Sequence, residues 1–293
     1  MPDSVITDEQ VRFFRENGYF ILRSVVHGEE FSRLRKAMDR LTEYGKLGVL
    51  GEPDFLYEPG PRSGTRVLRR IEYILDKTDE AKVLMGHPFI LRSVEKLAGK
   101  DFIPTWDSLV TKLPKEGIEV PWHRDADMKY MGDTPIFSVD FYLDAADEDT
   151  CLWVLPGSHR WSTADAERAV ERPGFETKGA KPMLMQPGDV LFHNIFLLHG
   201  SKENISNKTR RVVYFEFRTA HIEAEKGPHT PEYIPLKQQI LMDCIERRKA
   251  APYVSKDETP YTYAPSAPWT VEPAAEPLSS HRVPHEDYWR EAK

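Results

Sequence analysis

Short apolar or alternating runs, separated by turn signals, fill the chain between Gly99 and Phe217, and this pattern limits the possible fold most. The runs are FIPTWDSLVTKL, IFSVDFYLD, CLWVLPG, KPMLMQPGDVLFHN, LLHGS and RRVVYFEFR. The Pro-Gly pair at 156–157 and the Pro-Gly-Asp triplet at 187–189 are typical turn sequences between them. Several short strands at this spacing predict an antiparallel sandwich or barrel, and not a sheet built from strand–helix–strand units.

Helical patterns flank this β-rich region. Apolar residues at helical spacing predict helices over 28–45, about 79–98 and 232–250. Residues 46–65 are rich in Gly and Pro and predict a loop over the domain. The pattern as a whole indicates helices packed outside a β core.

We expect one domain over residues 1–293, because no internal repeat or linker divides the chain. Its expected parts are helical support over 1–100, a β core over 101–220 with a polar excursion at 160–181, and a C-terminal helix with an extended tail over 221–293.

Composition narrows the functional class. The net charge of −7 argues against a nucleic-acid partner, because non-specific binding needs an excess of Lys and Arg. No apolar run approaches the ~20 residues that span a bilayer, and the N-terminus lacks the pattern of a secretory signal. Two cysteines, Cys151 and Cys244, are too few for a disulfide framework. We therefore expect a cytoplasmic protein with no nucleic-acid and no membrane partner.

The stretch VPWHRDAD, residues 120–127, places a histidine and an aspartate two positions apart. Such residues on a strand point to the same side, so His123 and Asp125 can share one metal ion. A third ligand must come from elsewhere. His199 ends an apolar run directly before Gly-Ser, whereas His193 lies inside a strand and is expected to be a hydrogen-bonded core or pocket residue. Two histidines and one carboxylate on one face of Fe(II) leave three positions open, which is typical of oxygen-activating iron.

An arginine follows at a useful place. Arg210 lies 11 residues after His199 and begins the run RRVVYFEFR, a strand expected to return beside the one that carries His199. A guanidinium there can bind a carboxylate with two parallel hydrogen bonds, which a lysine cannot copy. The adjacent Arg211 points to the opposite face and is expected to be exposed to solvent.

These motifs together resemble a known family. WHRD, PGSH (156–159), PGDVLFH (187–193), LHGS (198–201) and the trailing Arg210 occur in the order found in the phytanoyl-CoA dioxygenase family of Fe(II)/2-oxoglutarate-dependent oxygenases. The resemblance runs from about Thr7 to Phe217. It implies a mainly β fold, a double-stranded β-helix (jelly roll, cupin-like) core with N-terminal helices packed against it.

The resemblance also implies a set of site residues. It places Fe(II) on His123, Asp125 and His199, and the C5 carboxylate of the cosubstrate 2-oxoglutarate on Arg210, with help from Ser201. The implied reaction consumes O2, releases succinate and CO2, and oxidises a C–H bond of a small organic substrate. Iron halogenases replace the carboxylate ligand with a small residue, so Asp125 favours hydroxylation, desaturation or another oxidation, with hydroxylation expected first.

Other positions are weaker candidates. Ser108, in SLVTKLP, matches a family strand that contacts 2-oxoglutarate, and Arg66 or Arg69 is expected near the same cosubstrate. An aromatic residue that often contacts the cosubstrate in the family falls near Asp140, so the chain departs from the pattern there. The candidates for the substrate pocket are Trp122, Phe137, Trp153, Arg66, Arg69 and Asp140.

Two other readings stay open. One is a different metalloenzyme on a cupin-like barrel, either a zinc hydrolase or an oxygenase that does not use 2-oxoglutarate. The other is a non-catalytic sensor of a small ligand. Arg210 and Ser201 argue against the first, because neither rival enzyme needs a 2-oxoglutarate clamp, and the complete ligand set argues against the second. The chain is expected to act as a monomer or homodimer.

Overall fold

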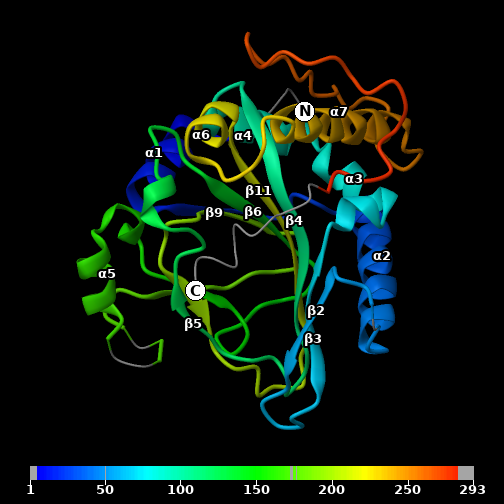
Figure 1. The fold of residues 1–293 in the computed structure, drawn as a ribbon. Coiled ribbons are helices and arrows are strands. Elements are labelled where there is room, and N and C mark those ends of the chain that lie inside the picture. The colour runs from blue at the N-terminus through cyan, green and yellow to red at the C-terminus, as the bar shows by residue number, and fades with distance from the viewer. Residues whose placement is uncertain (1–4, 50, 172–173, 176, 283–293) are drawn as a thin grey trace.

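Two antiparallel sheets face each other at the centre of the molecule (Figure 1). The computed structural model describes residues 5–49, 51–171, 174–175 and 177–282. Within these residues the larger sheet has, in spatial order, β1 (Tyr19–Leu22), β9 (Val190–Asn194), β6 (Phe137–Tyr142), β11 (Arg210–Thr219), β4 (Phe102–Lys112), β3 (Arg66–Glu72) and β2 (Phe55–Pro59). The smaller sheet has β5 (Val120–His123), β10 (His199–Ser201), β7 (Leu152–Val154) and β8 (Lys181–Met183). The two sheets are separate and do not close into one barrel, and the predicted β core is confirmed.

The larger sheet has two different faces, because successive side chains of a strand point in opposite directions. On β11, Val213, Phe215 and Phe217 belong to the main apolar core together with helical residues. Arg210, Tyr214 and Glu216, on the opposite face of the same strand, line a cavity between the sheets. One face therefore anchors the helices, and the other carries polar groups towards the smaller sheet.

Helices cover the outer face of the larger sheet, as expected (Figure 1). They include α1 (Asp8–Asn17), α2 (Gly28–Lys46) and α7 (Tyr233–Ala250). In this view the short helix α6 (Ala220–Lys226) lies at the top between α1 and α7, and α5 (Thr163–Ala169) lies at the left.

The single helix predicted over about 79–98 is wrong in one respect, because it is two helices. They are α3 (Asp79–Met85) and α4 (Pro88–Ala98). Proline fits the first turn of a helix but cannot continue one from before it, so α4 begins at Pro88. A Cβ atom on Gly86 would lie 2.5 Å from the backbone oxygen of Cys244 in α7. The absence of a side chain at Gly86, between α3 and α4, therefore lets α7 pack closely against this break.

The loop predicted over 46–65 is also partly wrong, because it contains β2. This strand pairs antiparallel with β3 at the edge of the larger sheet. Its first residue, Phe55, packs edge-on against Tyr44 of α2 at 5.5 Å between ring centroids. This short strand is held by α2 on one side and by β3 on the other. The local sequence of β2 predicts neither contact.

The polar excursion at 160–181 contains α5 and packs on the outer face of the smaller sheet. Phe175 is 4% exposed and lies 5.1 Å from Trp122 and 6.4 Å from Trp153, measured between ring centroids. The indole N–H of Trp122 donates to the backbone oxygen of Gly174 at 2.9 Å. Gly174 and Phe175 are thereby fixed against β5, the strand that carries Trp122 and His123.

The C-terminal segment returns across the helices to the larger sheet (Figure 1). Residues 251–282 contain no helix or strand, as the sequence predicts, and residues 283–293 lie outside the described part. The hydroxyl of Tyr261 donates to Glu95 in α4, and that of Ser266 donates to Asp101. His281 lies between Asp76 and Asp107. Across the described residues, the helices are too short or too polar to cross a bilayer.

Candidate metal centre and cosubstrate cavity

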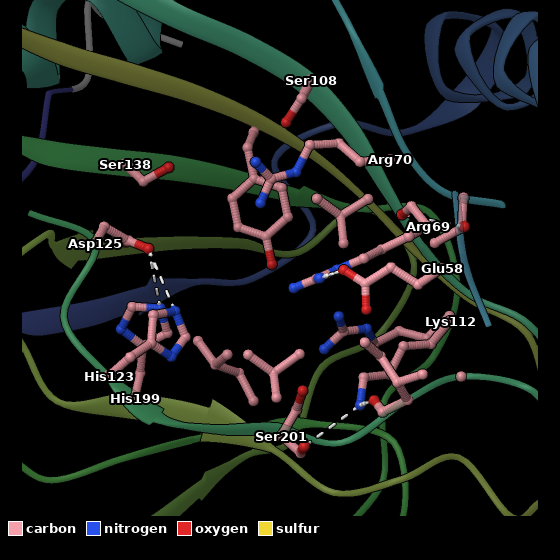
Figure 2. Close-up of a pocket in the computed structure, with 18 of the residues that line it drawn as sticks. Glu58, Arg69, Arg70, Ser108, Lys112, His123, Asp125, Ser138, His199 and Ser201 are labelled. Carbon is pink, nitrogen blue, oxygen red and sulfur yellow. Dashed lines mark hydrogen bonds and ion pairs between the residues drawn. The ribbon is translucent and has the colours of Figure 1, made fainter. Parts of the chain in front are cut away.

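The smaller sheet brings two distant histidines together. His123 ends β5 and His199 begins β10, and the two are direct cross-strand partners. Their ring centroids are 4.2 Å apart. Asp125 follows two residues later, where its backbone N–H donates to the oxygen of Ile195 at 2.8 Å. One ligand atom from each of the three residues lies within 4.8 Å of the other two (Figure 2).

Backbone hydrogen bonds fix the tautomer of both histidines. Nδ1 of His123 lies 2.8 Å from the oxygen of Pro121, and Nδ1 of His199 lies 2.9 Å from the oxygen of Leu197. A carbonyl oxygen only accepts, so Nδ1 must carry the hydrogen in each ring. Each Nε2 then presents a lone pair to the shared space, which is the arrangement found in metal-ligating histidines.

Asp125 completes this donor set. Its Oδ1 lies 3.5 Å from Nε2 of His123 and 3.5 Å from Nε2 of His199. Burial alone would raise the pKa of Asp125, but the three neighbouring imidazoles outweigh it and hold the pKa well below its ordinary value. A divalent ion bound about 2.1 Å from each atom separates neighbouring ligands by about 3–4 Å. The donor types and spacing therefore fit Fe(II).

A third histidine contacts the same carboxylate from the larger sheet. Nδ1 of His193 lies 2.9 Å from Oδ2 of Asp140, and its Nε2 lies 3.3 Å from Oδ2 of Asp125. Burial lowers the pKa of His193, but the two carboxylates outweigh burial and raise that pKa to about 10. The sequence suggested a hydrogen-bonded pocket residue at this position, and that prediction is confirmed.

A cavity lies beside His123, Asp125 and His199, between the two sheets (Figure 2). The predicted site residues that line it are His123, Asp125, His199, Arg210, Ser201, Ser108 and Arg69. Arg210 is 2% exposed, and its Nε and Nη1 are buried without a hydrogen-bond partner among the described residues. Unpaired buried donors are costly. The cavity therefore fits an anionic ligand such as a dicarboxylate.

Further polar residues in the cavity wall were not predicted from the sequence. They include Glu58, Arg70, Lys112, Ser138, Tyr214 and Glu216. Tyr214 and Glu216 alternate with apolar residues after Arg210, so strand periodicity was a usable signal for both. Arg70 reaches the cavity because β3 pairs with β4, where Glu72 opposes Ser108. That non-local pairing leaves no local signal.

Two of these basic residues differ in how they are held. Lys112 donates its Nζ to the backbone oxygens of Ile118, at 2.7 Å, and of Lys202, and burial lowers the pKa of Lys112 to about 6. Nε of Arg70 is buried without a hydrogen-bond partner among the described residues. Its Nη1 lies 3.9 Å from Oε1 of Glu72, and its guanidinium lies 6.0 Å from the ring centre of Trp106. The ammonium group of Lys112 therefore binds backbone oxygens of the protein, whereas Nε of Arg70 can donate a hydrogen bond to an anion.

The remaining pocket candidates lie elsewhere. Trp122 and Trp153 pack around Phe175 on the outer face of the smaller sheet. Phe137 is fully buried in the core under the helices. Alternation along the strand explains all three, because their neighbours on β5, β7 and β6 point into the space between the sheets.

Arg66 and Asp140 are also outside the cavity lining. The guanidinium of Arg66 lies 4.5 Å from the ring centre of Tyr57 at the sheet edge. Asp140 is fully buried behind His193, to which it is hydrogen-bonded. The position of the expected aromatic residue is thus occupied by a carboxylate that faces a histidine.

Comparison with known proteins agrees with this geometry. Residues 14–212 match the phytanoyl-CoA dioxygenase family. The chain belongs to this family. A dioxygenase named lolE1 from Epichloe uncinata is 27% identical over 216 residues, which cover 73% of this chain and 83% of that protein. Human peroxisomal phytanoyl-CoA dioxygenase is 25% identical over 248 residues, which cover 75% of this chain and 70% of that protein.

Solved structures show the same fold. EctD from S. alaskensis with bound Fe has a TM-score of 0.63 and 22% identity, covering 79% of this chain and 84% of that chain. Another structure of EctD holds 2-oxoglutarate and 5-hydroxyectoine. The predicted jelly-roll core is confirmed by this likeness. Family membership makes the chain a non-haem Fe(II)/2-oxoglutarate-dependent dioxygenase, so the predicted reaction class and cofactors are confirmed.

Proposed function

We propose that His123, Asp125 and His199 hold Fe(II), and that the enzyme hydroxylates a C–H bond of a small organic substrate. The observation that carries this proposal is the convergence of two Nε2 lone pairs on one oxygen of Asp125, each at 3.5 Å. Three protein ligands on one face of the ion leave three positions open. With 2-oxoglutarate bound there, the iron would activate O2 to oxidise the substrate, with release of succinate and CO2.

Arg210 is proposed to bind the C5 carboxylate of 2-oxoglutarate. Among the described residues its Nε and Nη1 have no hydrogen-bond partner, which supports this role, because a carboxylate accepts charge-assisted hydrogen bonds from a guanidinium. Ser201 also lines the cavity and follows His199 by two positions on β10, so its hydroxyl can assist. Ser108 and Arg70, from neighbouring strands, are proposed to contact the rest of the cosubstrate.

Other residues of the wall prepare the site for substrate. Ile195, Val120 and Leu152 line the cavity next to the ligands and exclude water from it. Tyr214 lies on the same face of β11 as Arg210, with its ring centroid 6.5 Å from that of His193. We propose that the phenol and the nearby Ser138 hydroxyl orient a substrate that carries polar groups beside its reacting carbon.

We also propose that residues 1–293 form one oxygenase domain that acts as a monomer or homodimer without nucleic acid. A cytoplasmic location is proposed as well. Both cysteines, Cys151 and Cys244, are free and buried, which supports a reducing compartment. Of the two relatives described above, the human enzyme is named for phytanoyl-CoA and the name of the fungal dioxygenase gives no substrate, so the family supports the oxidant and leaves the substrate to be found by screening.

Anaerobic binding tests this proposal. Fe(II) is added to metal-free protein, 2-oxoglutarate is titrated, and the visible charge-transfer absorption of the chelated keto acid is recorded. We expect the band in the wild type, its loss in Asp125→Ala, and a much higher 2-oxoglutarate requirement in Arg210→Ala. A wild type that gives no band and retains zinc would overturn the proposal in favour of a hydrolase.

A further inference from the structure

The two oxygens of Asp125 face different partners. Oδ1 lies 3.5 Å from the Nε2 atoms of both His123 and His199, and Oδ2 lies 3.3 Å from Nε2 of His193. His193 is 1% exposed, and its other nitrogen is held by Asp140, which is fully buried. The carboxylate is therefore shared between the smaller sheet, which carries the two ligand histidines, and the larger sheet, which carries His193 and Asp140.

We propose that His193, held by Asp140, is a positioning residue that keeps Asp125 a one-oxygen ligand of the metal. This inference rests on the proposed function, since it concerns the same Fe(II) site. A carboxylate free to rotate can bind a metal through both oxygens. If Asp125 did so, it would take one of the three open positions, and 2-oxoglutarate and O2 together need all three. The hydrogen bond from His193 holds Oδ2 away from that position.

The hydrogen positions follow from the partners. Both ring nitrogens of His193 face carboxylate oxygens, which accept hydrogen bonds when ionised, so both nitrogens are donors. Asp140 fixes the rotation of the ring and balances its charge in a site closed to solvent. Among the described residues Oδ1 of Asp140 has no partner, and the bond to His193 is the one hydrogen bond of the Asp140 carboxylate. A residue that touches a ligand in this way commonly changes metal affinity by about 10–100-fold when it is replaced.

The backbone supports the same geometry. His193 lies on β9 opposite Ser138 of β6, and Asp140 of β6 opposes Leu191 of β9. His193 and Asp140 are thus diagonal neighbours on one face of two paired strands, close enough for a direct contact. The larger sheet fixes their spacing, and Asp125 is tied to the same region by its backbone bond to Ile195.

The test uses Co(II) binding to the full-length protein, which reports coordination without turnover. His193→Phe keeps a ring in the core but removes both hydrogen bonds, and we expect the Co(II) dissociation constant to rise about 10–100-fold. The visible d–d spectrum of bound Co(II) should also change, because a second carboxylate oxygen alters the coordination. His193→Gln should restore most of the wild-type affinity and spectrum, since its amide can donate where Nε2 does.

His281→Phe is the matched control. His281 also bridges two carboxylates, Asp76 at 2.7 Å and Asp107 at 2.6 Å, and is also 1% exposed, but it contacts none of the proposed metal ligands. We expect this variant to lose stability and to keep the wild-type Co(II) affinity and spectrum. Thermal unfolding of each variant without metal separates a loss of fold from a loss of metal geometry.

Wild-type Co(II) affinity and an unchanged spectrum in a folded His193→Phe protein would overturn the inference. If that variant does not fold, Asp140→Asn decides, because its amide oxygen still accepts from Nδ1. A smaller loss of affinity with a changed spectrum supports the proposal, and wild-type behaviour overturns it. If the wild type itself binds no metal, the proposed function fails and this inference fails with it. If the wild type forms the 2-oxoglutarate band and the variants match it in Co(II) affinity and spectrum, only the proposed role of His193 is contradicted. The proposed function then stands.

Discussion

Two adjacent arginines on β11 show how the two faces of the larger sheet differ. Arg211 points towards the helices, donates from Nε to Asp144 at 2.9 Å and pairs with Asp39 of α2. Arg210 points into the cavity, and its Nε and Nη1 have no hydrogen-bond partner in the part of the chain that the structure describes. Both side chains are buried, at 2% for Arg210 and 7% for Arg211. The guanidinium of Arg211 is paired with carboxylates of the protein, whereas that of Arg210 is available to a ligand.

The two bridging histidines repeat this contrast. His281 joins two carboxylates whose interactions stay within the protein, and it ties the C-terminal segment to β4. His193 joins Asp140 to Asp125, whose second oxygen points at two other imidazoles. Burial and ion pairing therefore do not by themselves mark a functional site. The sign of function here is that buried guanidinium atoms of Arg210 and Arg70 that lack a hydrogen-bond partner among the described residues lie in the wall of one cavity.

The largest expected effect is the loss of the carboxylate ligand. Asp125→Ala should abolish Fe(II) binding and succinate formation, because two neutral imidazoles alone do not hold the ion at this site. Its fold should persist, since Asp125 contributes no apolar packing. Metal content by elemental analysis and far-UV circular dichroism check the two halves of this statement. Tight iron binding by Asp125→Ala would place the metal elsewhere.

Replacement of Arg210, the arginine of the cavity, should weaken cosubstrate binding. Arg210→Ala should raise the dissociation constant of 2-oxoglutarate by about 10²-fold, as expected for one partner of a buried, charged hydrogen-bonded pair. The Fe(II) affinity should be unchanged, because Arg210 contacts none of the three ligands. Titration under anaerobic conditions measures both constants. An unchanged 2-oxoglutarate affinity would show that another group, such as Arg70, is the anchor.

Replacement of Arg211, the arginine paired within the protein, should lower stability and leave cosubstrate binding unchanged. Arg211→Met should lower the free energy of unfolding by about 3 kcal/mol, because it leaves the buried Asp144 without its cation. The 2-oxoglutarate affinity of the folded variant should equal that of the wild type. Denaturant unfolding and the anaerobic titration give the two numbers. A loss of cosubstrate affinity without a loss of stability would erase the contrast between the two faces.

Acid should act on the His281 bridge, with a smaller effect. Burial alone raises the pKa values of Asp76 and Asp107, but hydrogen bonds and charge from His281 outweigh it and lower both below 3.8. A carboxylate with a lowered folded-state pKa stabilises the fold above 3.8, and this contribution is lost as the pH falls through the folded-state pKa. Stability of the wild type should therefore fall more steeply below pH 3.8 than that of His281→Phe. Parallel slopes would show that the bridge contributes nothing.

The sequence predicted much of the fold because its signals were local. Runs with strand-like composition became β4, β6, β9 and β11, and the helical repeats became α2 and α7. One error missed a local signal, because Gly86 and Pro88 divide the helix predicted over about 79–98. The other came from long-range packing, because β2 depends on pairing with β3 and on packing against α2.

The same division applies to the site. The spacing of His123, Asp125 and His199 is visible in motifs, because each lies in a short, ordered stretch. The interpretation of Arg211 as exposed was wrong, because its partners Asp39 and Asp144 are distant in sequence. For the same reason sequence reasoning could not join Asp140 to His193, or bring Arg70 to the cavity wall.

The most direct test of the whole account is a crystal structure of the protein loaded anaerobically with Fe(II) and 2-oxoglutarate. Anomalous scattering should place iron between His123, His199 and Oδ1 of Asp125, with Oδ2 still bonded to His193. The far carboxylate of 2-oxoglutarate should lie on the unpaired nitrogens of Arg210. Iron bound by both oxygens of Asp125, or a cosubstrate carboxylate away from Arg210, would contradict the account.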